Sequence, residues 1–196
     1  DENPFLGYRA IRLCLDRKED IYKPQLRALL RASAYGNIRI MIPLVTCIDE
    51  LREAKALIEE IKAELDEKNI AYKKDIQVGI MVETAAASLI ADIFAKEADF
   101  FSIGTNDLTQ YTMSVDRGNK KVSYLYSTFN PAVLRSIRHI IACGREAGIM
   151  VGMCGEAASD PMMIPLLLAF GLNEFSMSAS AILRARKMVT EYSVEE

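Results

Sequence analysis

The sequence lacks the residues and patterns that mark several large protein classes. It has no Trp, one His and four cysteines without a Cys-x-x-Cys pair, so neither a common zinc site nor a disulfide framework is indicated. Its longest strongly apolar stretch, residues 162–170, is far shorter than the roughly 20 residues of a membrane-spanning helix. The net charge is −3, which gives no basic field for phosphates. We expect no nucleic-acid partner, no membrane insertion, and reduced thiols in a cytoplasmic protein.

Phosphate-binding loops and targeting segments are missing as well. Neither Gly-x-Gly-x-x-Gly nor a P-loop occurs, which weakens a nucleotide-binding Rossmann fold. The first residues show no basic segment followed by an apolar one, as a signal peptide would, and no initiator Met. We therefore expect a single domain over residues 1–196 that is part of a longer polypeptide.

What is present is an alternation of short apolar runs and helical patterns. The runs are nearly continuous in Ile, Val, Phe and Met, as buried parallel strands are, and lie at residues 38–42, 76–82, 100–104, 150–154 and 175–177. Helical spacing of apolar residues predicts connecting helices at 49–68, 85–95, 132–146, 161–170 and 179–189. Two more helices, at 6–15 and 25–34 with a break near Lys23-Pro24, precede the first strand. Repeated βα units of this kind predict either a doubly wound sheet or a (β/α)₈ barrel, and five units are too few to close a barrel.

Polar residues follow three of the predicted strands directly. Glu83 follows the second run, Asn106 and Asp107 the third, and Cys154 ends the fourth. Ligands bind at the carboxyl ends of strands in both fold types, and two neighbouring carboxylates suit Mg²⁺. The alternatives are a solvated strand end for Glu83, helix caps for Asn106 and Asp107, and core packing for Cys154.

Three other polar residues have plainer interpretations on the sequence alone. Arg9 and Arg117 are compatible with solvated surface positions. Arg39 lies inside an apolar run and needs a partner if it is buried, because an unpaired buried charge is costly.

Five separate motifs resemble enzyme I of the bacterial phosphoenolpyruvate:sugar phosphotransferase system, a family of phosphoenolpyruvate-utilising enzymes. They appear in family order over nearly the whole chain: Asn3-Pro4-Phe5-Leu6-Gly7-Tyr8-Arg9-Ala10, Met81-Val82-Glu83-Thr84, Phe101-Ser102-Ile103-Gly104-Thr105-Asn106-Asp107-Leu108-Thr109-Gln110-Tyr111, Val115-Asp116-Arg117-Gly118-Asn119 and Gly152-Met153-Cys154-Gly155-Glu156. Pyruvate phosphate dikinase and phosphoenolpyruvate synthase are similar at two of these motifs.

The resemblance implies part of a phosphoenolpyruvate-binding (β/α)₈ barrel, with about five of its eight strands. It implies that Glu83 and Asp107 bind Mg²⁺, that Arg9 holds the substrate phosphate, and that Asn106, Asp107 and Arg117 hold the carboxylate end and neighbouring oxygens. Cys154 is then the proton donor to C3 of the enolate. Arg39 is a weaker candidate for facing the phosphate. The family's partners are phosphoenolpyruvate and pyruvate, the carrier protein HPr through a missing N-terminal domain, and a second copy in a homodimer.

Two departures from the family pattern matter. Ala85 stands where many members have Pro, which affects the start of a helix rather than a ligand. The Thr-Ser-His motif of the phosphorylated His is absent, and His139 does not match it. A fragment of a dikinase or synthase, or a catalytically inactive interaction module, therefore remains an alternative. For the chain alone we expect an exposed apolar inner sheet face, covered by self-association or by the segment 6–34.

Overall fold

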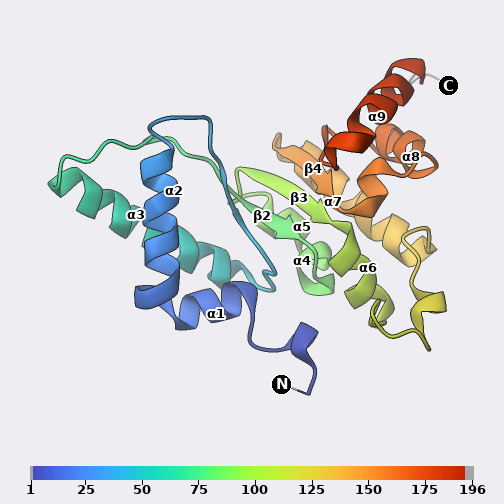
Figure 1. Ribbon diagram of the computed structural model, residues 1–196, viewed down its shortest axis with the longest axis horizontal. Coiled ribbons are helices and arrows are strands. Elements are labelled where there is room, and N and C mark those ends of the chain that lie inside the picture. The colour runs from blue at the N-terminus through green and yellow to red at the C-terminus, as the bar shows by residue number, and fades with distance from the viewer. Residues whose placement is uncertain (1, 193–196) are drawn as a thin grey trace.

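Five parallel strands form the centre of the molecule. The computed structural model describes residues 2–192 (Figure 1). Strands β1 to β5 cover Ile40–Ile42, Val78–Val82, Phe100–Gly104, Met150–Cys154 and Glu174–Phe175. Each overlaps one of the predicted apolar runs, so the prediction of five strands is confirmed.

The order of the strands identifies the kind of α/β fold. The sheet runs β1-β2-β3-β4-β5 and every neighbouring pair is parallel. A doubly wound sheet reverses its strand order at a switch point, whereas strands that follow one another in chain order form the wall of a barrel. The fold is therefore an arc of a (β/α)₈-type barrel, and the doubly wound alternative is wrong.

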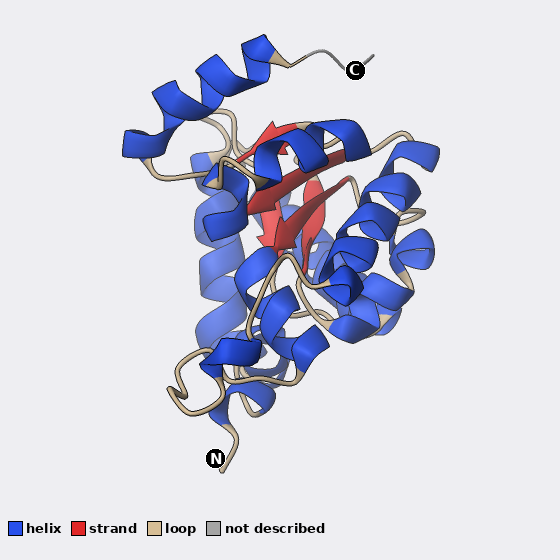
Figure 2. Ribbon diagram, turned by 90° about the vertical axis from the view of Figure 1, so that its right-hand side faces the viewer, coloured by secondary structure: helices blue, strands red, loops and turns tan. Residues whose placement is uncertain are grey.

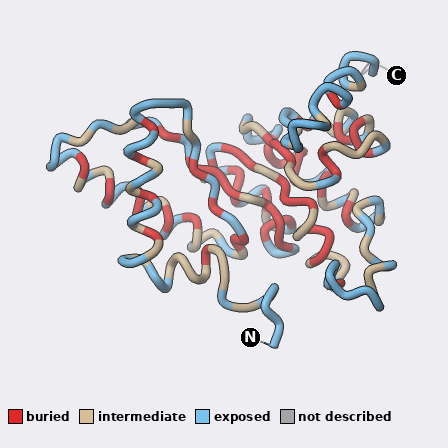
Figure 3. The backbone as a smooth tube through the Cα atoms, in the orientation of Figure 1, coloured by how far each residue is buried: buried red, intermediate tan, exposed pale blue. Residues whose placement is uncertain are grey.

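One face of this sheet carries the hydrophobic core. A row of paired residues across β1 to β4, namely Ile42, Ile80, Phe101 and Val151, is at most 1% exposed. These side chains belong to the same buried cluster as apolar residues of the helices. Figure 3 shows that the buried segments of the backbone run through the middle of the molecule. The helices enclose the strands in the view of Figure 2. Burial of this face fixes the register of the strands, because a slip by one residue would turn the core residues to the opposite face.

The other face is open but is not an apolar patch. Its next row of paired positions holds Met81, Ser102, Gly152 and Glu174, and the row at the carboxyl ends holds Gly104 beside Cys154. Among the described strand residues, Met41 is the only large hydrophobic side chain that is exposed. The expectation of an exposed apolar inner face is therefore wrong for the described strands, because Phe100 on this face is 7% exposed and small and polar residues alternate there with the methionines.

The helices agree with the predicted pattern except in four places. The α-helices α1 to α9 are Ala10–Asp16, Lys23–Ala32, Ile48–Glu67, Ala85–Leu89, Ala91–Phe94, Thr105–Met113, Pro131–Glu146, Met163–Phe170 and Ala179–Glu191. Short 3₁₀ turns lie at Pro4–Leu6, Ser123–Leu125 and Glu156–Ser159, and a π-turn at Lys18–Tyr22. Helix α1 begins later than expected, the helix over 85–95 is divided into two, and α6 was not predicted. None of the described helices is long and apolar enough to cross a membrane.

The predicted break near Lys23-Pro24 is the start of α2 instead. Pro24 occupies the first turn of that helix, where its missing N–H costs no hydrogen bond. Helices α1 and α2 pack against α3, and Ile11, Leu26 and Leu30 are fully buried there. Figure 1 shows α2 and α3 together on one side of the sheet. The first helices thus extend the helical layer, and the expectation that they cover the open face of the sheet is wrong.

Candidate active site

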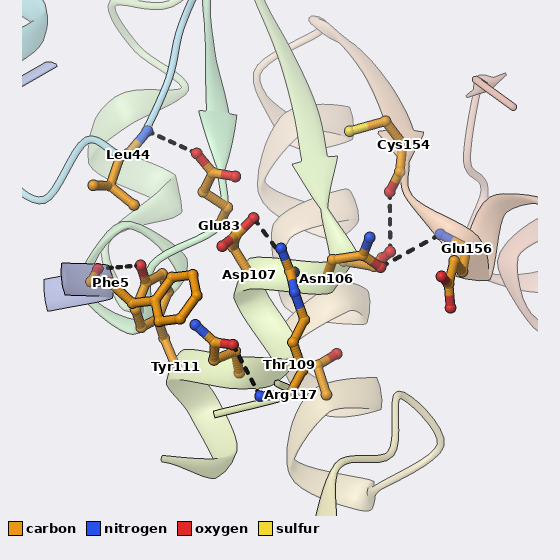
Figure 4. Close-up of polar contacts among 12 residues, drawn as sticks. Phe5, Leu44, Glu83, Asn106, Asp107, Thr109, Tyr111, Arg117, Cys154 and Glu156 are labelled. Carbon is orange, nitrogen blue, oxygen red and sulfur yellow. Dashed lines mark hydrogen bonds and ion pairs between the residues drawn. The ribbon is translucent and has the colours of Figure 1, made fainter. Parts of the chain in front are cut away.

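The carboxyl ends of β2, β3 and β4 bring the predicted polar residues together. Figure 4 shows Glu83 and Asp107 side by side, with Asn106 and Arg117 next to them and Cys154 beyond Asn106. The sheet order explains this gathering, because β2, β3 and β4 are direct neighbours and parallel, so their carboxyl ends share one edge.

Glu83 is a buried carboxylate with one backbone donor. It is 8% exposed, and its Oε1 accepts a hydrogen bond of 2.8 Å from the N–H of Leu44. Burial raises the pKa of Glu83 to about 7; the Leu44 bond opposes this shift, and the negative charge of Asp107 adds to it. Gly104 makes the room for this side chain, since a Cβ at that position would lie 2.6 Å from Glu83 Oε2. The alternative of a solvated strand end is wrong.

Asp107 lies in the first turn of α6 and is incompletely paired. Its Oδ2 is 3.7 Å from the guanidinium of Arg117. Its Oδ1 is buried and, among the described residues, has no hydrogen-bond partner. A buried carboxylate oxygen without a partner is costly, so this atom fits the role of a ligand to a metal ion or a substrate group.

Asn106 connects α6 with the segment after β4. Its Oδ1 accepts a hydrogen bond of 3.4 Å from the N–H of Glu156, and its carbonyl accepts one of 3.1 Å from the hydroxyl of Tyr126. The N-cap of α6 is Gly104, and no side-chain capping bond is present there. The alternative of Asn106 and Asp107 as helix caps is therefore wrong.

Cys154 is half-buried at the end of β4. Its thiol lies 3.5 Å from Met81 Sδ. Burial raises the pKa of the Cys154 thiol above its ordinary value; a hydrogen bond with Ser102 opposes this, and the nearby carboxylates of Glu83 and Asp107 support it. A cleft of about 350 Å³ opens beside the thiol, lined in part by Asn106, Glu156 and Ser176. The residue is therefore a protonated thiol at neutral pH that a small molecule can approach.

Arg9 and the N-terminal segment lie on the β2 side of the site. The guanidinium of Arg9 is 5.5 Å from the centre of the Phe5 ring, and its positive charge lowers the pKa of Glu83. The hydroxyl of Tyr111, on α6, donates to the carbonyl of Phe5. Helix α6 thus holds the segment that carries Arg9.

The structure places Arg39 far from this group. Arg39 directly precedes β1 and is exposed, with its guanidinium 5.6 Å from the centre of the Phe100 ring and its Nη1 3.5 Å from Met150 Sδ. Phe100 and Met150 are the first residues of β3 and β4. Arg39 therefore lies at the amino edge of the sheet, opposite the candidate site, and does not face it.

Two residues that matter to this geometry were not predicted. The N–H of Leu44 reaches Glu83 because Leu44 adopts φ 56°, a left-handed conformation that no sequence signal marks in a Leu. The hydroxyl of Thr105 donates to the carbonyl of Cys154 at 3.0 Å. Thr105 stands inside the motif next to Asn106 and could have been chosen on that ground.

The chemistry of the site fits a divalent cation held jointly with a substrate. Glu83 is a buried carboxylate and Asp107 a partly buried one. Their negative charges repel each other, and the buried Oδ1 of Asp107 has no hydrogen-bond partner among the described residues. Within residues 2–192, no group of three or more His, Cys, Asp or Glu residues is placed to hold a metal. Mg²⁺ commonly takes one or two carboxylates and fills its other positions with water and substrate oxygens.

An arc of parallel strands with its polar residues gathered at the carboxyl edge defines a (β/α)₈-type ligand-binding domain. Comparison with known families then specifies which one. The family described as "PEP-utilising enzyme, PEP-binding domain" matches residues 1–194, where PEP is phosphoenolpyruvate. The chain belongs to this family.

Named relatives and one solved structure support the assignment. The chain is 57% identical over 194 residues to the phosphoenolpyruvate-protein phosphotransferase of Geobacillus stearothermophilus, covering 99% of this chain and 33% of that protein. It is 56% identical over 194 residues to that of Bacillus subtilis strain 168, covering 99% of this chain and 34% of that protein. The chain thus spans about a third of the length of these relatives. A crystal structure of a citrate lyase from Burkholderia xenovorans LB400 has a TM-score of 0.62 at 21% identity, over 85% of this chain and 54% of that one, which supports the fold.

Proposed function

We propose that this chain is the phosphoenolpyruvate- and Mg²⁺-binding portion of a phosphoenolpyruvate–protein phosphotransferase, enzyme I. The observation that carries the proposal is the buried Glu83 beside the partly buried Asp107, whose buried Oδ1 has no hydrogen-bond partner among the described residues. A buried negative charge beside a second negative charge is unfavourable, and a doubly charged cation with an anionic substrate removes the cost. The names of the relatives favour this function over a dikinase or a synthase.

The basic residues at the edge hold the substrate anion. Arg9 binds the phosphate, and Arg117 with Asn106 binds the carboxylate end and nearby oxygens. Arg117 already lies within 3.7 Å of Asp107, and its exposed side leaves further N–H donors for a ligand. Arginine suits this task because its planar donors match both phosphate and carboxylate oxygens.

Glu83 and Asp107 hold the Mg²⁺ ion. A bound Mg²⁺ would supply positive charge against the oxygens of phosphoenolpyruvate as the phosphoryl group leaves. The Leu44 N–H fixes one oxygen of Glu83, so the other oxygen is directed to the ligand side. The Oδ1 of Asp107, which has no hydrogen-bond partner among the described residues, is the second oxygen proposed to bind the ion.

Cys154 completes the reaction by protonation. When the phosphoryl group moves to a His nitrogen of another domain, the enolate of pyruvate remains. The S–H of Cys154 gives its proton to C3, forming pyruvate, and the thiolate then takes a proton from water. A thiol whose pKa is raised by burial suits this step, because it remains protonated until the carbanion-like carbon is formed.

The whole protein's function extends beyond this chain. The accepting His and the contact with HPr would belong to segments outside it, in a cytoplasmic enzyme that serves sugar uptake. The remaining barrel strands would pair with the edges of β1 and β5, so that the chain is one part of a single domain. The protein would act as a homodimer, which sedimentation velocity of the intact protein tests.

Calorimetric titration of the chain with phosphoenolpyruvate tests the proposed site. We expect binding in Mg²⁺ that is lost in EDTA, and we expect Cys154→Ala to bind as the parent does. In the intact enzyme, the same variant should lower pyruvate formation by about 10²–10⁴-fold, because only the proton transfer is removed. Binding that ignores Mg²⁺ would contradict the metal site, and equal loss of binding and turnover in Cys154→Ala would make Cys154 structural.

A further inference from the structure

At the end of β4, the backbone carbonyl of Cys154 needs a hydrogen-bond donor from outside the sheet. The β3–β4 ladder ends at the pair Gly104 and Cys154, and the next residue of the β3 side, Thr105, already belongs to helix α6. Beyond this pair, β3 therefore offers the Cys154 carbonyl no further strand N–H. Buried carbonyl groups in proteins nearly always find a donor.

Thr105 supplies that donor. Its side chain is fully buried, and its hydroxyl donates to the Cys154 carbonyl at 3.0 Å. One residue further on, the Asn106 side chain accepts from the N–H of Glu156. The first turn of α6 thus contacts the chain on both sides of Gly155. Figure 4 shows the two dashed lines that end on Cys154 and Glu156.

Gly155 lies close to the hydroxyl of Thr105. Its φ is +98°, a conformation that favours glycine. A Cβ at this position would lie 2.4 Å from the Thr105 hydroxyl oxygen. The backbone of Gly155 therefore lies close against the Thr105 hydroxyl, where no other side chain fits without a shift.

We propose that Thr105 is a positioning residue for the Cys154 thiol, a role that rests on the proposed function of Cys154 as the proton donor. By fixing the Cys154 carbonyl, Thr105 fixes the backbone from which the side chain projects, and so holds Sγ against Met81. A proton donor must lie within hydrogen-bond reach of the accepting carbon, and a displacement of about 1 Å is enough to lower a rate strongly.

The chain offers a matched control for a purely structural effect. Thr109 lies on the same helix, is also fully buried, and pairs its hydroxyl with that of Thr128 at 3.3 Å. Thr109→Val and Thr105→Val each remove one buried hydroxyl and keep the shape of the side chain. Only Thr105 contacts the backbone of Cys154.

The test measures the thiol directly, without turnover. In a chain whose Cys14, Cys47 and Cys143 are replaced, Cys154 is the remaining thiol, and its alkylation by iodoacetamide is followed at pH 8. We expect Thr105→Val to raise the alkylation rate at least fivefold, because the released segment exposes Sγ. Thr105→Ser, which keeps the hydroxyl, and Thr109→Val should stay within twofold of the parent.

Urea unfolding of every variant identifies any that fails to fold, and Thr105→Ala replaces Thr105→Val in that case. The proposal is overturned if the Thr105 variants alkylate no faster than Thr109→Val, or if Thr105→Ser behaves like Thr105→Val. Phosphoenolpyruvate binding is measured on the parent in parallel. If the parent does not bind phosphoenolpyruvate but the variants alkylate as expected, the proposed function is contradicted. The contact between Thr105 and the Cys154 backbone would still be established.

Discussion

Charged residues are arranged in opposite ways in two regions of the molecule. One is the contact of the segment 18–27 with α3, here called the seam; the other is the carboxyl edge of β2 to β4, here called the edge. At the seam, basic residues from the segment 18–27 pair with acidic residues of α3 whose side chains are solvent-accessible: Lys18 with Glu53, Lys23 with Glu60 at 2.7 Å, and Arg27 with Glu64 at 2.5 Å. At the edge, the buried Glu83 lies beside the partly buried Asp107, and the nearest counter-charge is an Arg117 nitrogen 3.7 Å from Asp107.

This difference separates charges that pair at the surface from the charges that we propose bind a metal ion. Exposed pairs gain little free energy because water screens them, and they cost little for the same reason. Buried like charges are expensive, so a chain that keeps them gains something other than stability. Each of the following predictions changes a residue either at the edge or at the seam.

The largest effect is expected from removing one edge carboxylate. Asp107→Asn keeps the shape of the side chain but removes the charge, so we expect Mg²⁺-dependent binding of phosphoenolpyruvate to disappear in calorimetric titration. Glu64→Gln makes the same kind of change at the seam and should bind as the parent does. An Asp107→Asn chain with the parent's affinity would remove Asp107 from the metal ligands.

Neutralising Glu83 should stabilise the empty chain while abolishing metal-dependent binding. The pKa of Glu83 is about 7 in the folded state, against an ordinary 4.5. The unfolded chain therefore releases this proton first, and stability falls as pH rises from about 4.5 to 7. Each unit of pKa difference between the folded and unfolded states corresponds to about 1.4 kcal/mol. The free energy of unfolding of Glu83→Gln should therefore exceed that of the parent by about 3 kcal/mol at pH 8 in EDTA.

The pH dependence provides the control for this prediction. Below pH 4.5 the Glu83 carboxyl is protonated in both states, so the difference between Glu83→Gln and the parent should vanish in urea titrations. A constant difference at all pH values would show that packing, rather than charge, distinguishes the two chains.

Filling the space beside Glu83 should have an intermediate effect. Gly104→Ala places a methyl group 2.6 Å from Glu83 Oε2 and 2.8 Å from Met81 Sδ, so we expect a loss of about 1–3 kcal/mol in urea unfolding and weaker Mg²⁺-dependent binding. Gly36→Ala is the matched control, because nothing lies within 4 Å of its added Cβ. Equal stability of the two variants would show that the site tolerates displacement of Glu83.

The smallest effect is expected at the seam. Arg27→Ala, Glu64→Ala and the double variant form a cycle for a pair in which both side chains are about one-third exposed. We expect the coupling of the two residues to lie near the detection limit in urea unfolding and to vanish at high salt. A large coupling that persists in salt would show that the seam holds α2 in place by charge.

The strands could be predicted from the sequence because buried parallel strands are almost continuous apolar runs. Residues 76–82 contain β2 for this reason. Helix α6 was missed because Thr105, Asn106 and Asp107 follow β3 without a break, and a polar run after a strand resembles a loop. The positions of the first helices depend on packing against α3, which no local pattern shows.

The residues of the candidate site could be predicted from the sequence, but their burial and the pKa of Glu83 could not. Glu83, Asp107 and Cys154 each lie at the carboxyl end of a predicted strand, and parallel strands bring such ends to one edge. That Glu83 is buried, and that the Leu44 N–H reaches it, depends on a contact between residues 39 positions apart. Burial and such long-range contacts determine the raised pKa, and both are properties of the folded chain alone.

The outermost strands of the sheet are also its shortest. β1 has three residues and β5 has two, whereas each of the three inner strands has five. An unpaired strand edge is a template for adding another chain, and its length sets how many backbone hydrogen bonds a wrong partner can gain. The arc therefore offers little to a fibril that grows from strand to strand. A correct neighbour that pairs with these short edges would need side-chain contacts in addition to the few backbone hydrogen bonds.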